Sequence, residues 1–271
     1  MANNSDDGWT HVPNKRGKSS TSKFVPTGPP PPAKDLSLAD VKADYEAKRR
    51  TWMQSDSRKQ LRQILKRMEP DDGWQLKEAV CMATGSFNRD NWENRKRSMR
   101  QFVVFMDIVQ YVQGEKEIDI YAQDPRFTEL DSEFLSGLGV RMLPFTLPEY
   151  DVAMLRLLFP REKNNGPLKP EDFPEICGPA AEHFGPSSFV CEFFMEFDEW
   201  LMKQIFHTNT KLLIGTFAHA VEHRSYASAP ALLEGCTKYH FPRFEEDPNV
   251  FDGLDLFMAK MEDSDEEQAK D

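Results

Sequence analysis

The feature that most constrains the fold is the run of residues 78–131, in which a strand-like stretch, a glycine turn, a periodic helix and a second strand-like stretch follow one another. The first stretch is apolar and ends at Gly85. The helical part, RSMRQFVVFMDIVQYV, repeats apolar residues at three- and four-residue steps, with Asp107 among the polar positions off the apolar face. Residues 118–122 alternate β-branched and polar side chains and stop before Pro125, which cannot donate to a ladder. This order predicts a parallel, right-handed βαβ unit.

The rest of the chain continues the alternation of strands and helices. Helical patterns are TELDSEFLSGL, EYDVAMLRLLFP and FDEWLMKQIFHT. Strands are predicted at 78–84, 118–122, 140–143, 188–195 and 211–216. Continuously apolar strands that alternate with helices are typical of a parallel sheet covered on both faces. We therefore predict an α/β fold, a Rossmann-like doubly wound, mainly parallel sheet with helices on both faces.

Composition divides the chain into one globular domain and its extensions. Apolar residues, 39% of the 271, are concentrated in the middle of the sequence. Residues 1–35, with a basic cluster and four successive prolines, are expected to form a disordered tail. Residues 36–72 are expected to form a helical extension, as one long helix or two shorter ones. The Rossmann-like domain is assigned to 73–243, and an acidic tail to 244–271.

Charge and cysteine usage limit the partners and the compartment. A formal net charge of -11 and a pI near 5.1 argue against general nucleic-acid binding. No stretch has a signal-peptide core or approaches the roughly 20 apolar residues that span a bilayer. Four cysteines without a Cys-x-x-Cys pair indicate a reducing compartment. We expect a cytoplasmic or nuclear protein, or one found in both, with no membrane contact and with protein partners that the sequence does not identify.

Polar residues at the ends of the predicted strands form a candidate ligand site. Thr84, Gly85 and Ser86 follow the first strand, Asp124 follows the second, and Glu196 follows a later one. The carboxyl ends of parallel strands meet at one edge of the sheet, and ligands bind there. Asp124 stands where nucleotide-binding folds place a ribose-binding carboxylate, so a small nucleotide-like ligand is the first interpretation. The alternative is a tight turn and a strand cap, because no full Gly-x-Gly-x-x-Gly motif is present. No cofactor is identified.

A second motif suggests zinc. His219, Glu222 and His223 match the His-x-x-Glu-His pattern of one zinc-peptidase class. Zinc would also require a helix at this position and a further carboxylate ligand, and the segment directly follows a predicted strand. We favour a surface pair of histidines, and we assign neither a metal site nor catalytic residues.

Several of these motifs resemble one known family. CMATGSF, SMRQFVVFMDIV, IYAQDPRFTELDSEFLSGLGV and FFMEFDEWLMKQIFHTNTKLLIGTF, with the opening DDGWTHV, are similar to the domain named for sensitivity to red light reduced (SRR-like), in a divergent fungal-type form. The resemblance covers residues 75–217, and its most specific part is the D-P-x-F-x-x-x-D block.

The resemblance implies a regulatory protein without a settled catalytic activity. In that family, regulation is linked to light input and circadian timing, to haem biosynthesis or to stress. One departure is at residues 193–198, where FFMEFD replaces the FFMPHC of many members, so the family histidine is missing. We therefore expect a non-enzymatic regulatory protein that binds a partner or ligand, and the alternative is an enzyme with a nucleotide or S-adenosylmethionine-type cofactor. The resemblance gives the family's characteristic positions to Gly85, Ser86, Gln101, Asp124, Pro125, Asp131 and Gly139.

Overall fold

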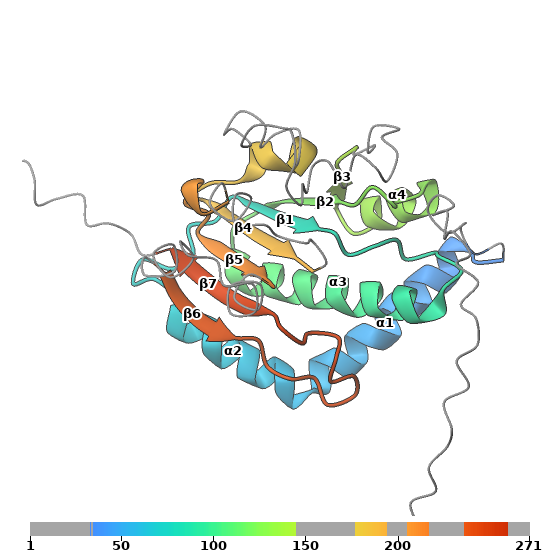
Figure 1. The fold of residues 1–271 in the computed structure, drawn as a ribbon, viewed down its shortest axis with the longest axis horizontal. Coiled ribbons are helices and arrows are strands. Elements are labelled where there is room, and N and C mark those ends of the chain that lie inside the picture. The colour runs from blue at the N-terminus through green and yellow to red at the C-terminus, as the bar shows by residue number, and fades with distance from the viewer. Residues whose placement is uncertain (1–32, 34, 145–176, 194–204, 217–235, 260–271) are drawn as a thin grey trace, which may run out of the picture.

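The protein folds around one seven-stranded sheet (Figure 1). The computed structural model describes residues 33, 35–144, 177–193, 205–216 and 236–259. The sheet has the order β3-β2-β1-β4-β5-β7-β6, and only β7 runs antiparallel to its neighbours. The α/β fold with a mainly parallel sheet is thus confirmed. The strands are β1 (Glu78–Met82), β2 (Asp119–Gln123), β3 (Val140–Met142), β4 (Ser188–Glu192), β5 (Leu212–Gly215), β6 (Cys236–His240) and β7 (Asp255–Ala259).

The five predicted strands correspond to β1–β5 at slightly different bounds. Strand β1 lies inside the sheet, with β2 on one side and β4 on the other, and its Cys81 is in register with Cys191 of β4. Both cysteines are fully buried. Because the chain runs outward from β1 to β2 and β3 and then returns to β4 on the other side, the order reverses between β1 and β4. Ligands bind at this kind of switch point in open α/β sheets.

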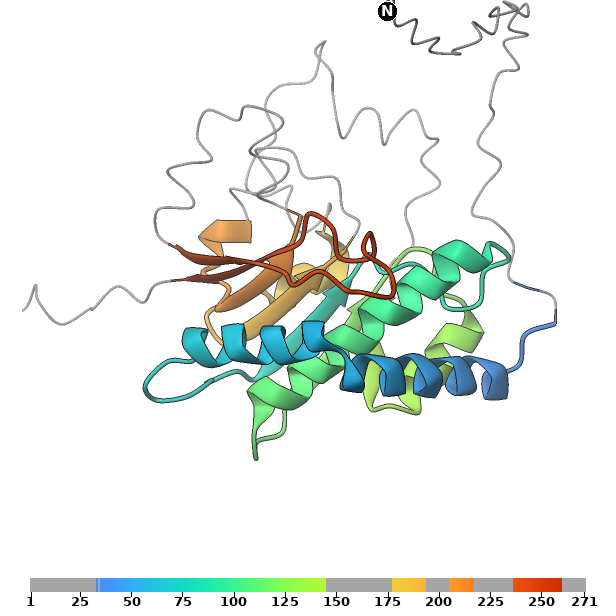
Figure 2. The ribbon, with the colours of Figure 1, turned by 90° about the horizontal axis from the view of Figure 1, so that it is seen from below.

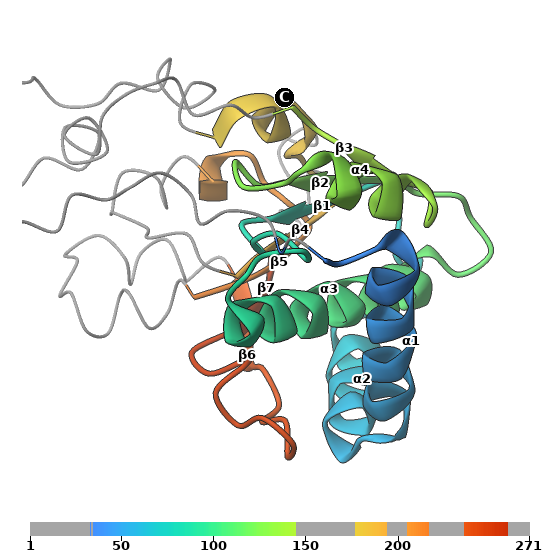
Figure 3. The same ribbon diagram turned by 90° about the vertical axis from the view of Figure 1, so that its right-hand side faces the viewer.

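The α-helices gather on one face of the sheet (Figures 2 and 3). Helix α3 (Trp92–Gln113) connects β1 to β2 and packs with the inward side chains of β1. Helix α4 (Glu129–Ser136) lies beside β3 and joins the same apolar cluster. The opposite face carries the 3-10 helix η2 (Gly178–His183) and the helical residues 205–207, in a second apolar cluster. Helical segments therefore cover both faces, as predicted.

The N-terminal extension is two helices, α1 (Leu38–Gln54) and α2 (Asp56–Met68), rather than one. Ser55 lies between them in an extended conformation, and its hydroxyl donates to Trp52 O at 2.7 Å. The same hydroxyl accepts from Arg58 N at 3.1 Å, so one residue ends the first helix and caps the second. Both helices pack onto the core cluster through buried apolar residues.

The predicted acidic tail is wrong for residues 244–259. These residues include β7, which pairs with β5 and β6, and side chains such as Phe244, Phe251 and Phe257 are buried. The prediction gave weight to the acids of this segment, although the apolar residues placed between them are enough to join the core. The antiparallel pair β6 and β7 was therefore missed.

Several predictions lie outside the described residues. They concern most of the tail 1–35, residues 260–271, the helical patterns near 149–160 and 197–204, Glu196, and the motif at 219–223. Among the described helices, none is long and apolar enough to cross a membrane.

Candidate functional site

A strained turn follows β1 at the switch point. Ala83 has a φ of 55° and Gly85 a φ of 78°, both in the left-handed region. A Cβ on Gly85 would lie 2.9 Å from Ser98 Oγ, so this position requires glycine for two reasons. A left-handed alanine costs about 1–2 kcal/mol, and such backbone strain is concentrated at functional sites. Thr84 lies between the strained Ala83 and the left-handed Gly85.

The Asp124 carboxyl holds this turn. Its Oδ2 accepts from Gly85 N at 2.8 Å, and its Oδ1 accepts from Arg126 N at 2.8 Å. The side chain is buried, and burial raises its pKa above the ordinary value although both hydrogen bonds oppose this change. The Gly85 amide is therefore occupied by Asp124 and does not point at a ligand. A carboxylate has about four acceptor sites, so Asp124 retains about half of its capacity.

Asp131 accepts twice as many hydrogen bonds as Asp124 does. Its Oδ1 accepts from Phe87 N at 2.8 Å, and its Oδ2 accepts from Ser86 Oγ at 2.7 Å. The same Oδ2 also accepts from Thr128 N at 2.8 Å and from Thr128 Oγ1 at 3.0 Å. Burial raises the pKa of Asp131, and its four donors, three of them on Oδ2, all belong to the loop and to the start of α4. Ser86 and Asp131 therefore fix the loop onto the start of α4.

Thr84 is the predicted site residue whose polar group is unused. The residue is fully buried, and its Oγ1 has no hydrogen-bond partner within the described part of the chain. A buried hydroxyl without a partner costs about 1–3 kcal/mol. The structure thus brings together Thr84, Gly85, Ser86, Asp124 and Asp131, which we name the edge cluster, while Glu196 lies outside the described residues.

Polar side chains at two other strand ends were missed by sequence reasoning. Gln123, the last residue of β2, donates to Cys177 O at 2.6 Å and accepts from Ala180 N at 2.9 Å, which ties β2 to η2. Glu192, the last residue of β4, accepts from Thr216 N at 2.8 Å, which joins the ends of β4 and β5. The signal available in the sequence was a polar residue at the last position of an apolar strand.

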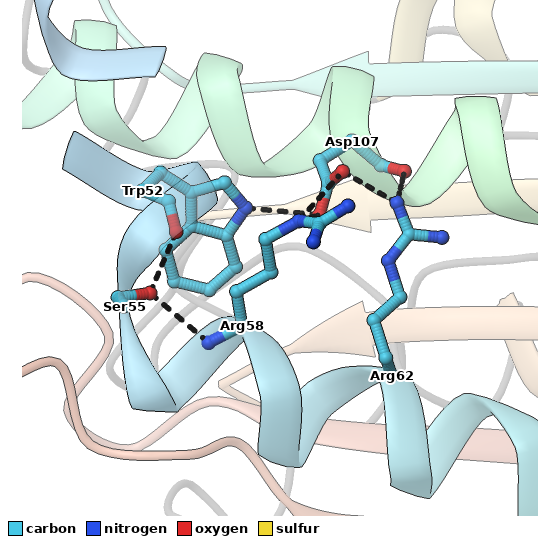
Figure 4. Close-up of polar contacts among 5 residues, drawn as sticks. All are labelled: Trp52, Ser55, Arg58, Arg62 and Asp107. Carbon is cyan, nitrogen blue, oxygen red and sulfur yellow. Dashed lines mark hydrogen bonds and ion pairs between the residues drawn. The ribbon is translucent and has the colours of Figure 1, made fainter. Parts of the chain in front are cut away.

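A second polar cluster joins three helices (Figure 4). Trp52 Nε1 donates to Asp107 Oδ2 at 2.9 Å, and Arg58 Nε donates to the same oxygen at 3.1 Å. Arg62 Nη2 donates to the carboxylate and to the main-chain oxygen of Asp107, the latter at 3.0 Å. The helical pattern placed Asp107 off the apolar face, but the residue is only 5% exposed because the N-terminal helices cover that side of α3.

No three His, Cys, Asp or Glu side chains of the described ranges are grouped as a metal site requires. The histidines of the zinc motif lie outside those ranges.

One protein-family model matches the chain. It is described as the SRR1 domain, and it matches residues 58–159. The matched range runs from α2 through β3 and includes the whole edge cluster. The predicted resemblance is confirmed for this part of the chain. No curated protein sequence gives a significant match.

Proposed function

We propose that this chain, which matches the SRR1 domain model at residues 58–159, is a regulatory protein that binds a small nucleotide-like ligand at the carboxyl edge of β1 and β2, with no reaction of its own. Two observations carry this proposal: the hydroxyl of Thr84 is unused, and the carboxylate that binds the amide of the next residue, Gly85, is only half used. A sugar with adjacent hydroxyls can donate to such a carboxylate and exchange a hydrogen bond with such a hydroxyl.

The hydrogen bonds of the edge cluster favour binding over catalysis. A general base or nucleophile needs a lone pair or a proton that is available to the substrate. Asp131 accepts from four donors, and Ser86 Oγ donates to Asp131. These two side chains therefore stabilise the loop rather than present a reactive group.

The proposal also covers the compartment of the protein and the kind of regulation in which it takes part. The free, buried thiols of Cys81 and Cys191 support a reducing compartment, and we place the protein in the cytoplasm or the nucleus. Protein partners would respond to the liganded state, in control of the circadian, stress or haem-linked kind that the resemblance implies.

The strand order supports a second candidate, an enzyme with an S-adenosylmethionine-type cofactor. An antiparallel β7 inserted between β5 and β6, beside the parallel order 3-2-1-4-5, is also the arrangement of Rossmann-like methyltransferases. The likeness is one of fold, and one fold hosts many functions. In this candidate the same edge would bind the nucleoside part of the cofactor.

A ligand panel combined with Thr84→Val tests the proposal. Thermal unfolding would be followed with adenosine, AMP, NAD(H), S-adenosylmethionine and haem, and a ligand at 100 times its Kd stabilises by about 2.7 kcal/mol. Valine has the shape of threonine without the hydroxyl, so the free variant should unfold at the same temperature as the wild type or slightly higher. Its response to the ligand should be lost.

Thr128→Val is the matched control. Thr128 Oγ1 caps α4 and donates to Asp131, so this variant should unfold at a lower temperature and still bind. If Thr84→Val binds every ligand as the wild type does, the proposed site is wrong. Conversion of S-adenosylmethionine to S-adenosylhomocysteine by the wild type would establish the second candidate instead.

A further inference from the structure

Arg89 is a buried cation that has no ion-pair partner among the residues that the structure describes. It lies in the loop between β1 and α3 and is 4% exposed. Its Nε and Nη1 have no hydrogen-bond partner in the described residues. Its Nη2 lies 3.4 Å from the main-chain oxygen of Arg126, which is a long contact for a hydrogen bond. Most of the donors of this guanidinium are therefore unused.

The charges around Arg89 do not compensate it. Burial lowers the pKa of Arg89, and Arg126 lowers it further, while Asp124 and Asp131 act in the opposite direction from a distance. Both carboxyls are already engaged with the loop, Asp131 by four donors and Asp124 by the amides of Gly85 and Arg126. A guanidinium does not lose its proton in a protein, so its burial is costly until an anion pairs with it.

The position of Arg89 connects it to the edge cluster. Asp124 holds Gly85 with one oxygen and Arg126 with the other, and Arg89 contacts the carbonyl of that same Arg126. The loop then enters α3, a helix of 22 residues that begins at Trp92. The first turn of a long helix attracts anions through its amide groups and its dipole. The unused donors of Arg89 are therefore linked through Arg126 and Asp124 to the turn that carries Thr84, and Arg89 itself stands three residues before α3 begins.

We propose that Arg89 binds a phosphate group of the ligand, which makes that ligand a nucleotide rather than a nucleoside. This inference rests on the proposed function, because it names the charged part of the same ligand. A planar guanidinium with free donors on adjacent nitrogens matches two phosphate oxygens at once, and such charge-assisted pairs are among the strongest hydrogen bonds in proteins. The phosphate would supply the counter-charge that Arg89 lacks.

The test compares Arg89→Gln with Arg141→Gln. Arg141 is 61% exposed in its side chain and pairs with Asp119 on the sheet, so its replacement removes an equal charge at an exposed site. Without ligand, Arg89→Gln should raise the unfolding midpoint, since it removes an uncompensated charge, and Arg141→Gln should not change it. Calorimetry with pyrophosphate, ADP and adenosine then measures binding. Pyrophosphate and ADP should bind Arg89→Gln roughly 10- to 100-fold more weakly than the wild type.

The three probes separate this inference from the proposed function. Adenosine should bind Arg89→Gln as it binds the wild type, and pyrophosphate should still bind Thr84→Val. If adenosine binds but ADP binds no more tightly and pyrophosphate does not bind, the phosphate inference is wrong and the proposed function stands. If pyrophosphate binds through Arg89 but adenosine does not bind and ADP binds no more tightly than pyrophosphate, Arg89 is a phosphate site, but the nucleotide-like ligand and the assignment of that phosphate to a nucleotide are both wrong.

A structural role for Arg89 would give another result. Arg89→Gln would then lower the unfolding midpoint and leave pyrophosphate binding unchanged, which would overturn the inference. Arg89→Lys provides a second variant if glutamine prevents folding. Lysine keeps the charge and loses the planar pair of donors, so it should fold and bind pyrophosphate more weakly than the wild type.

Discussion

Trp52 on α1 donates its indole N–H to the carboxylate of Asp107 on α3 at 2.9 Å. Asp107 also pairs with Arg58 and Arg62 on α2, so one buried carboxylate joins three helices. The two arginines remain partly exposed, at 24% and 19% of their side chains, while Asp107 is 4% exposed in its own. Helices α1 and α2 are therefore attached to α3 by a polar contact as well as by apolar packing.

Replacement of Asp107 by Asn should destabilise the protein more than replacement of Trp52 by Phe. Asp107→Asn leaves two arginines without their carboxylate, and we expect a loss of about 2–4 kcal/mol after allowance for their exposure. Trp52→Phe removes one hydrogen bond and part of a ring, for about 1–2 kcal/mol. Urea unfolding measures both changes. The control is Asp56→Asn, whose partner Lys59 is exposed, and its midpoint should not move. Equal midpoints for Asp107→Asn and Asp56→Asn would contradict a structural role of the cluster.

The Asp124 carboxyl should contribute a characteristic pH dependence. Burial raises its folded pKa above the ordinary value of 3.8, so below the folded pKa the native state binds more protons than the unfolded state. This carboxyl therefore costs stability at neutral pH, and that cost is relieved as the pH falls through the folded pKa toward 3.8.

The difference in unfolding free energy between wild type and Asp124→Asn isolates this contribution. It should be constant above the folded pKa and should move in favour of the wild type as the pH falls toward 3.8. Urea titrations between neutral pH and about pH 4 measure it. A difference that moves toward the variant on acidification would show that the folded pKa is lowered instead.

Strand β7 should behave as part of the core. Phe257 is fully buried in the cluster on the second face, and its replacement by Ala should cost about 3–5 kcal/mol. Asp252 is an exposed residue of the same segment, and Asp252→Ala should change the free energy of unfolding by less than about 0.5 kcal/mol. Thermal unfolding compares the two variants. A mobile acidic segment would tolerate both equally.

The sequence predicted best where local and tertiary requirements agree. The strands β1–β5, the helical extension after residue 36 and the helix of the TELDSEFLSGL pattern follow from short-range patterns. The sequence-based prediction was wrong where burial depends on packing between distant segments. Asp107 is the example, because α1 and α2 bury it. Strands β6 and β7 were missed because their partners are distant in sequence and acids lie among their apolar residues.

The candidate site shows the same division. The turn that carries Thr84, Gly85 and Ser86 contacts Asp124 through the Gly85 amide, because parallel strands bring their carboxyl ends to one edge, whereas the binding of a ligand there stays a prediction. Which of their polar groups remain available could not be predicted, since that depends on hydrogen bonds across the loop. Arg89 gave no signal in the sequence, because an arginine in a polar loop is usually solvated.

A comparison of Gly73 with Gly85 separates the cost of a positive φ from the cost of a steric clash at Cβ. Gly73 has a φ of +74° and open space where a Cβ would stand, whereas Gly85 has a φ of +78° and would place a Cβ 2.9 Å from Ser98 Oγ. Gly73→Ala should therefore cost about 1–2 kcal/mol, and Gly85→Ala should cost clearly more. Chemical unfolding measures both. Equal losses of unfolding free energy in the two variants would show that the loop after β1 can shift to accommodate a Cβ at Gly85 at no cost.

Cys81 and Cys191 are in register on neighbouring strands, so their chemical labelling can measure how often the centre of the sheet unfolds. Both thiols are fully buried on neighbouring central strands, and burial raises the pKa of each well above its ordinary value. Only the thiolate reacts with alkylating reagents, so neither cysteine can be labelled until β1 and β4 are exposed to water. The labelling rate at these two positions therefore follows the rarest and largest unfolding events of the molecule, and a ligand that binds at the switch point should slow it.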